Sequence, residues 1–149
     1  MLNPIVEHFR RYFNLTEVVD QQTAKRDGDK AWGYFDLRLL EVLIWIREGL
    51  GIPLVINTKT QQQRGLRTNV CQLVKEKTLA GILYITAHLL GKGVDFNAAG
   101  NRMTAEQIRQ WIVAHIDECP HPIRLEKDVN WVHIDVCNVT DQKLVWFKG

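Results

Sequence analysis

Two histidines and one aspartate are the residues of this sequence whose types and spacing best suit metal chemistry. His88 and Asp95 lie seven residues apart, separated by a segment that contains Gly91 and Gly93, and His133 follows much later. Two imidazoles and one carboxylate can bind zinc and leave its fourth position open to water, as catalytic zinc sites do. Spacing alone is a weak signal, because a single histidine in a strand is more often a hydrogen-bonded structural residue.

Regular elements must hold these side chains, and periodicity predicts where the elements are. Strands are predicted at 53–57, 82–87, 94–96, 131–136 and 144–147. The second of these would end just before His88, while the third contains Asp95 and the fourth contains His133. The glycines at 91 and 93 allow a sharp turn, which lets the backbone bring the first two ligands toward one ion.

The periodicity of the apolar residues also predicts three helices. They run from Pro4 to about Asn14, from the capping residue Asp36 to about Gly51, and from Thr104 to just before Pro120. Thr104 and Gln107 have the spacing of a capping box. The polar segments 21–30 and 58–68 are predicted to be exposed connections.

The predicted strands and helices place the chain in the α+β class, and its length indicates one domain, residues 1–149. Its net charge gives no electrostatic preference for a partner. The chain has 149 residues and 46% hydrophobic residues, enough to close one sizeable core. Its 19 basic and 17 acidic side chains nearly cancel, which argues against nucleic acid as a ligand. No apolar run approaches the roughly 20 residues of a membrane-spanning helix. No secretory signal is visible, so we expect a protein that is cytoplasmic as synthesised.

The remaining histidines and the cysteines are predicted to be structural. Cys71, Cys119 and Cys137 are odd in number and lack a CxxC pair, so we expect reduced thiols that form neither disulfides nor a thiolate zinc site. The histidines at 8, 115 and 121 have no partner at metal-ligand spacing.

Two segments resemble motifs of the D-alanyl-D-alanine carboxypeptidase family of zinc peptidases. Ile85-Thr-Ala-His-Leu-Leu-Gly-Lys-Gly-Val-Asp-Phe96 is similar to the family pattern Ser-x-His-x-x-Gly-x-Ala-x-Asp-Phe. Trp131-Val-His-Ile-Asp135 is similar to the second histidine motif, and Gln63-Arg-Gly-Leu-Arg-Thr-Asn69 to a preceding arginine segment. The resemblance covers residues 53 to 137 in order.

This resemblance implies a fold, a metal and a substrate. It implies a small antiparallel β-sheet backed by helices, the fold shared with hedgehog signalling domains, and zinc held by His88, Asp95 and His133. The implied activity is hydrolysis of bacterial cell-wall peptidoglycan, as a D,D-carboxypeptidase or an endopeptidase, with a stem peptide or D-Ala-D-Ala-type substrate. Relatives of this version are frequently phage or prophage enzymes, which act on the wall after release or export by other means.

The sequence departs from the family pattern at three positions. Thr86 replaces the usual serine and Gly93 the usual alanine, small changes that we expect to leave the metal geometry intact. Many relatives place an acidic residue, the general base, three residues before the second histidine, where this chain has Asn130. An amide cannot accept a proton from water, so another carboxylate must serve.

Three carboxylates are candidates for that base. Asp128 is the first choice, because it stands in the loop just before the strand of His133, and Glu126 is the weaker option. Asp135 shares a strand face with His133 and could instead orient that ligand.

Arg64 and Arg67 are predicted to bind the substrate carboxylate, since a guanidinium binds a carboxylate through two parallel hydrogen bonds. Arg64 is the stronger candidate of the two. The missing acid at position 130 also supports an alternative function, a non-catalytic zinc module that binds cell wall or a phage structural protein. A metal-free globular domain is a third interpretation.

Overall fold

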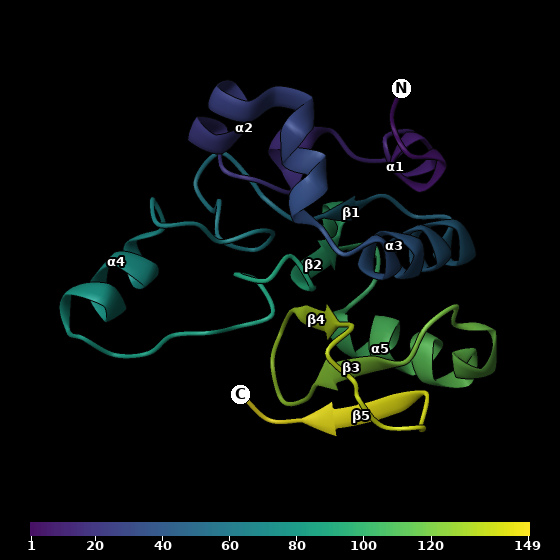
Figure 1. The fold of residues 1–149 in the computed structure, drawn as a ribbon. Coiled ribbons are helices and arrows are strands. Elements are labelled where there is room, and N and C mark those ends of the chain that lie inside the picture. The colour runs from purple at the N-terminus through teal and green to yellow at the C-terminus, as the bar shows by residue number, and fades with distance from the viewer.

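A computed structural model describes residues 1–149 as a five-stranded sheet with five α-helices (Figure 1). The elements are α1 (Pro4–Phe9), α2 (Gln21–Asp27), α3 (Leu37–Leu50), β1 (Leu54–Val55), α4 (Gln72–Leu79), β2 (Gly93–Ala98), α5 (Ala105–Ala114), β3 (Ile123–Glu126), β4 (Val132–Asp135) and β5 (Leu144–Phe147). Short 3₁₀ helices lie at Leu15–Glu17, Gly28–Tyr34, Ala99–Asn101 and Ile116–Glu118. The predicted α+β class is confirmed.

The sheet is mixed, which corrects the prediction of a purely antiparallel one. Its strand order is β1-β2-β4-β3-β5, and every neighbouring pair is antiparallel except β3 and β5, which run parallel. After β4 the chain crosses β3 to reach the free edge of that strand. The chain then forms β5, which runs in the same direction as β3. A tight hairpin would instead have made β5 antiparallel to the strand before it.

The predicted capping residues begin α3 and α5. The Asp36 carboxylate accepts a hydrogen bond from the backbone N–H of Arg38 at 2.9 Å, and α3 ends where Gly51 adopts a left-handed conformation. Thr104 and Gln107 form both reciprocal bonds of a capping box, at 2.9 and 3.1 Å. α1 is shorter than predicted, since it ends at Phe9.

Alternation along the strands gives the sheet one apolar and one polar face. Val94 and Phe96 of β2 and Val132 and Ile134 of β4 are fully buried in the hydrophobic core. The intervening residues of these strands, together with alternate residues of β3, point to the opposite face. We call this the functional face; its residues are Asp95, Asn97, Arg124, Glu126, His133 and Asp135.

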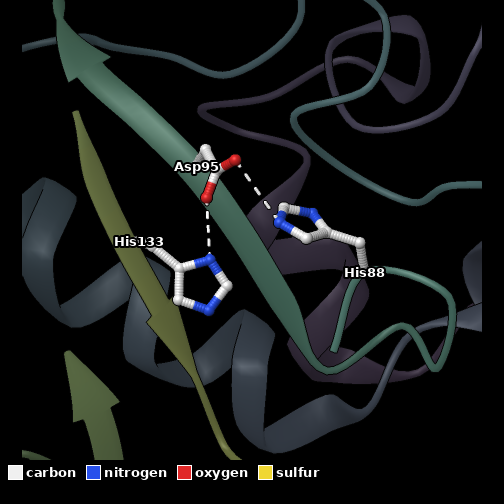
Figure 2. A group of neighbouring side chains, drawn as sticks. All are labelled: His88, Asp95 and His133. Carbon is white, nitrogen blue, oxygen red and sulfur yellow. Dashed lines mark hydrogen bonds and ion pairs between the residues drawn. The ribbon is translucent and has the colours of Figure 1, made fainter. Parts of the chain in front are cut away.

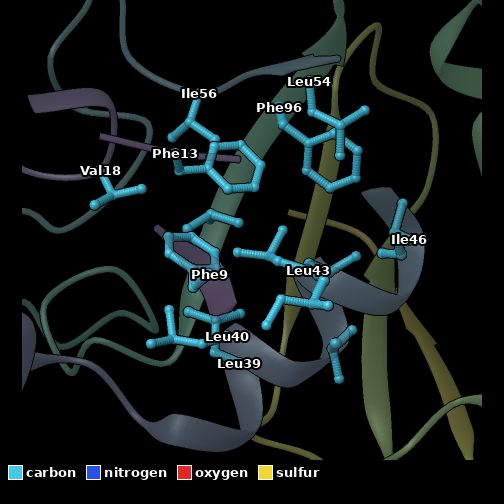
Figure 3. Packing of buried hydrophobic residues seen from close by; sticks show 14 of the residues in the cluster. Phe9, Phe13, Val18, Leu39, Leu40, Leu43, Ile46, Leu54, Ile56 and Phe96 are labelled. Carbon is cyan, nitrogen blue, oxygen red and sulfur yellow. The ribbon is translucent and has the colours of Figure 1, made fainter. Parts of the chain in front are cut away.

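The apolar face packs on helices, and the core joins the N-terminal helices to the sheet (Figure 3). Phe9 of α1, Leu43 of α3 and Phe96 of β2 are all fully buried in this cluster. α5 lies beside α3, where the ring centroids of Trp45 and Trp111 are 5.0 Å apart. This helix layer supports the two strands that carry Asp95 and His133.

Two sequence predictions about local structure are wrong, and two elements of the structure were not predicted. Residues 82–87 form no strand, because the segment that returns from α4 toward the sheet pairs with no strand edge (Figure 1). Its apolar side chains Ile82, Leu83 and Ile85 are exposed. Segment 21–30 contains α2 rather than an irregular connection, because Asp20 caps that helix through the N–H of Thr23 at 2.8 Å. Strand β3 and helix α4 were not predicted.

No helix of the structure combines the length and the apolar character that crossing a bilayer requires.

Candidate metal centre

The structure brings His88, Asp95 and His133 together on the functional face (Figure 2). Asp95 of β2 and His133 of β4 are directly opposite each other in the antiparallel register, and His88 comes from the turn before β2. His133 Nδ1 is 2.7 Å from Asp95 Oδ1, and His88 Nε2 is 3.4 Å from Asp95 Oδ2. One ligand atom from each residue lies within 4.8 Å of the others, so this group could hold a metal ion.

Hydrogen bonds outside the group orient both imidazoles. His88 Nδ1 lies 2.9 Å from the carbonyl oxygen of Gly65, which can only accept, so Nδ1 donates and Nε2 faces Asp95. His133 Nε2 donates to Asp135 Oδ2 at 2.8 Å, which leaves Nδ1 facing Asp95. Each ring therefore presents one nitrogen to the same point, an arrangement typical of metal-binding histidines.

Asp135 is the centre of a buried network behind His133. Its carboxylate is fully buried and accepts two hydrogen bonds from Arg124, from Nε to Oδ1 and from Nη2 to Oδ2, both at 2.8 Å. The backbone N–H of Cys137 also donates to Oδ1 at 3.0 Å. The sequence-based alternative for Asp135, an orienting partner of His133, agrees with these contacts.

The charges of the group are strongly coupled. Burial raises the pKa of Asp95, but hydrogen bonds from His133 and His88 outweigh burial and lower this pKa below its usual range. Burial lowers the pKa of His133, but hydrogen bonds to Asp135 and Asp95 outweigh it and raise this pKa to about 9. The metal-free group therefore holds a proton on His133 at neutral pH, and a metal ion must displace that proton.

Two hollows meet at the group. The first, about 800 Å³, is polar and is lined by Arg64, Asn97 and Asn130 among others. The second, about 630 Å³, contains His88 and His133 and is walled by Tyr84, Phe147 and other residues. Asp95, Arg67 and Trp131 line both hollows, so the candidate metal-binding group of His88, Asp95 and His133 lies where the hollows join.

Both predicted arginines line the polar hollow, with different partners. Arg67 donates from Nε to the carbonyl of Gln63 at 2.7 Å and from Nη1 to the Tyr84 hydroxyl at 2.8 Å, and its Nη2 is 3.7 Å from Asp95 Oδ2. Arg64 donates from Nη2 to the side-chain oxygen of Asn97 and has no other side-chain partner. Arg64 therefore has more free donors for a ligand.

The three candidate bases occupy different environments. Asp128 adopts a left-handed backbone conformation, its side chain is 64% exposed, and its carboxylate is 3.8 Å from Lys148 Nζ. It lines neither hollow, so the structure does not bring the first-choice base to the metal-binding group. Glu126 lies on β3 and lines the second hollow. Because β3 was not predicted, the sequence could not place Glu126 on the same sheet face as His133.

Cys137 and Trp131 also lie at the site. Cys137 lines the second hollow, and burial together with the Asp135 carboxylate raises the pKa of its thiol, which keeps the thiol neutral. Trp131 lines both hollows, and its indole N–H has no hydrogen-bond partner.

Gly93 is tightly enclosed, which explains why this chain lacks the alanine of the resembled motif. A Cβ at position 93 would lie 2.6 Å from Ala87 Cβ, 3.0 Å from Asp135 Cβ and 3.3 Å from His133 Cε1. We predict that Gly93→Ala lowers the free energy of unfolding by about 1–3 kcal/mol through overpacking. Denaturant titration measures this cost, which should shrink in an Ala87→Gly background. An equal cost in both backgrounds would contradict the packing explanation.

Comparison of the chain with protein-family models, curated proteins and solved structures finds no match. The motif resemblance and the geometry of the site are therefore the basis of the functional proposal.

Proposed function

We propose that this protein is a zinc-dependent metallopeptidase that hydrolyses peptide bonds of bacterial cell-wall peptidoglycan. The observation that carries the proposal is the convergence of His88 Nε2, His133 Nδ1 and Asp95 on one point, with both histidine rings oriented by partners outside the group. These three residues would hold the ion.

The donor set favours zinc among the common metals. Two neutral imidazoles and one carboxylate are a usual ligand set of catalytic zinc, whereas calcium and magnesium prefer oxygen ligands alone. When bound, zinc supplies Lewis-acid chemistry to a water molecule and a substrate carbonyl. The hollows on either side of Asp95 give a peptide room to extend past the ion.

The chain's own residues supply substrate binding. Arg64, with Arg67 beside it, is proposed to bind a carboxylate of the stem peptide or of a D-Ala-D-Ala-type substrate in the polar hollow. Burial lowers the pKa of Arg64, against an opposing effect of Asp95, yet the guanidinium stays charged at neutral pH. Asn97 accepts a bond from Arg64 and donates to the backbone carbonyl of Asn130 at 3.0 Å, which holds the arginine in place.

A second candidate function is a zinc-binding module without catalysis, which binds cell wall or a phage structural protein. It is favoured by Asn130, which stands where the resembled family has its acidic residue. The same metal-binding group would then serve stability or binding alone.

One experiment separates the two functions. The full chain is dialysed against a mild chelator, reloaded with zinc, and incubated with muropeptides and with peptides ending in D-Ala-D-Ala. We expect one zinc per chain by metal analysis, and cleavage products by mass spectrometry that disappear in the metal-free sample. One bound zinc without any cleavage would support the module instead.

A further inference from the structure

The proposed hydrolysis needs a carboxylate that accepts a proton from water, and the structure narrows the choice to one residue. We infer that Glu126, and not Asp128, is the general base of this site, an assignment that rests on the proposed function.

Strand register places Glu126 beside the metal-binding group. β3 and β4 pair antiparallel with Arg124 opposite Asp135 and Leu125 opposite Ile134, so one step further along this register puts Glu126 opposite His133. Cβ atoms of directly opposed residues lie about 4.5–5.5 Å apart on the same face. Arg124 and Asp135, the preceding pair on this face, already meet at 2.8 Å.

The hydrogen bonds of Asp135 and the exposure of Asp128 exclude these two carboxylates as the base. Asp135 accepts bonds from Arg124, His133 and the backbone of Cys137 and is fully buried, so it is not open to water. Asp128 is mostly exposed and is oriented toward Lys148. Glu126 makes no hydrogen bond or ion pair through its carboxylate and is half-buried in the wall of the hollow that contains His88 and His133.

The inferred step balances as ordinary amide hydrolysis. A water oxygen forms a bond to the carbonyl carbon while one water proton passes to the Glu126 carboxylate. The C–N bond then breaks, and Glu126 returns that proton to the leaving nitrogen. Glu126 ends the cycle ionised, and no oxidant or further reactant is needed.

The test compares Glu126→Gln with the matched control Asp128→Asn in the full, zinc-loaded chain. Both substitutions exchange a carboxylate for an amide of the same shape. We expect Glu126→Gln to keep one zinc per chain and to slow peptide cleavage by about 10²- to 10⁴-fold. Asp128→Asn should cleave at the parental rate. Glu126→Asp, which keeps a carboxylate at shorter reach, should retain an intermediate rate, a result that misfolding would not produce.

A second readout does not depend on cleavage. Acetohydroxamic acid binds zinc as an anion after its proton passes to a neighbouring carboxylate, so calorimetry should show its Kd increasing at least about tenfold in Glu126→Gln. Asp128→Asn should leave this Kd unchanged. An unchanged Kd in Glu126→Gln, or no hydroxamate binding by the zinc-loaded parent, overturns the assignment whatever the cleavage rates are.

The two proposals can fail separately. If hydroxamate binding weakens in Glu126→Gln but the parent cleaves no peptide, the proposed peptidase is wrong and Glu126 is still the proton acceptor beside the ion. If the parent cleaves peptides and Asp128→Asn rather than Glu126→Gln abolishes cleavage, the peptidase stands and the Glu126 assignment is wrong.

Discussion

Replacing His133 by alanine is expected to lower the affinity for zinc by about 10²- to 10³-fold and to abolish peptide cleavage. Structural zinc sites with four ligands have apparent binding free energies of about 10–16 kcal/mol, which is about 2.5–4 kcal/mol for each ligand. His133 is directly opposite Asp95 in the sheet and is a member of the three-residue group, so its loss leaves two ligands. Competition with a chromogenic chelator measures the change.

The matched control for this prediction is His8→Ala. His8 lies on α1, its side chain is 39% exposed, and its partner is Glu48 at 3.3 Å, so it has no role in the metal-binding group. This variant should bind zinc like the parent. Added zinc should also raise the melting temperature of the parent and of His8→Ala but not of His133→Ala, because only a folded site binds the ion. Equal zinc affinity in the two variants would refute the proposed ligand set.

Replacing Asp135 by alanine is expected to destabilise the protein by about 3 kcal/mol, even without metal. The substitution leaves Arg124, the Nε2–H of His133 and the N–H of Cys137 without their acceptor. Removing one partner of a buried ion pair costs about 3–5 kcal/mol, and the value here lies at the lower end because the Arg124 side chain is 33% exposed. Chemical denaturation of metal-free protein measures the loss.

The same substitution should weaken zinc binding by about 10- to 100-fold, since hydrogen-bonding partners of metal-binding histidines have effects of this size. Asp135→Asn should retain part of the affinity, because its side-chain oxygen can still accept from His133. Asp141→Ala is the control, as Asp141 is exposed and makes no ion pair. If zinc affinity fell in Asp141→Ala as much as in Asp135→Ala, the orienting role of Asp135 would be wrong.

His88, Asp95 and His133 could be named from the sequence because their residue types suit zinc and the segments that carry them resemble motifs of a zinc peptidase family. Their spacing alone would have been a weak signal. The helix termini at Asp36 and Thr104 were equally predictable, because capping depends on residues a few positions apart.

Pairing between distant segments was decided only by the tertiary structure. Residues 82–87 have the alternation of a strand but meet no strand edge, whereas β3 pairs with β4 on one side and with β5 on the other. Asp128 is the candidate carboxylate that most nearly precedes His133 along the chain, yet it has a left-handed backbone conformation and an exposed side chain whose carboxylate lies 3.8 Å from Lys148 Nζ.

The sequence by itself determined the α+β class and the helix caps, because these depend on residue type and short spacing. Residue types together with the motif resemblance also named the residues that could bind a metal. The tertiary structure decided that β5 runs parallel to β3, that Asp135 orients His133, and that Glu126 rather than Asp128 faces the site. The physical reason is that cross-strand register brings together side chains from separate segments, and no local pattern encodes which strand edges will meet.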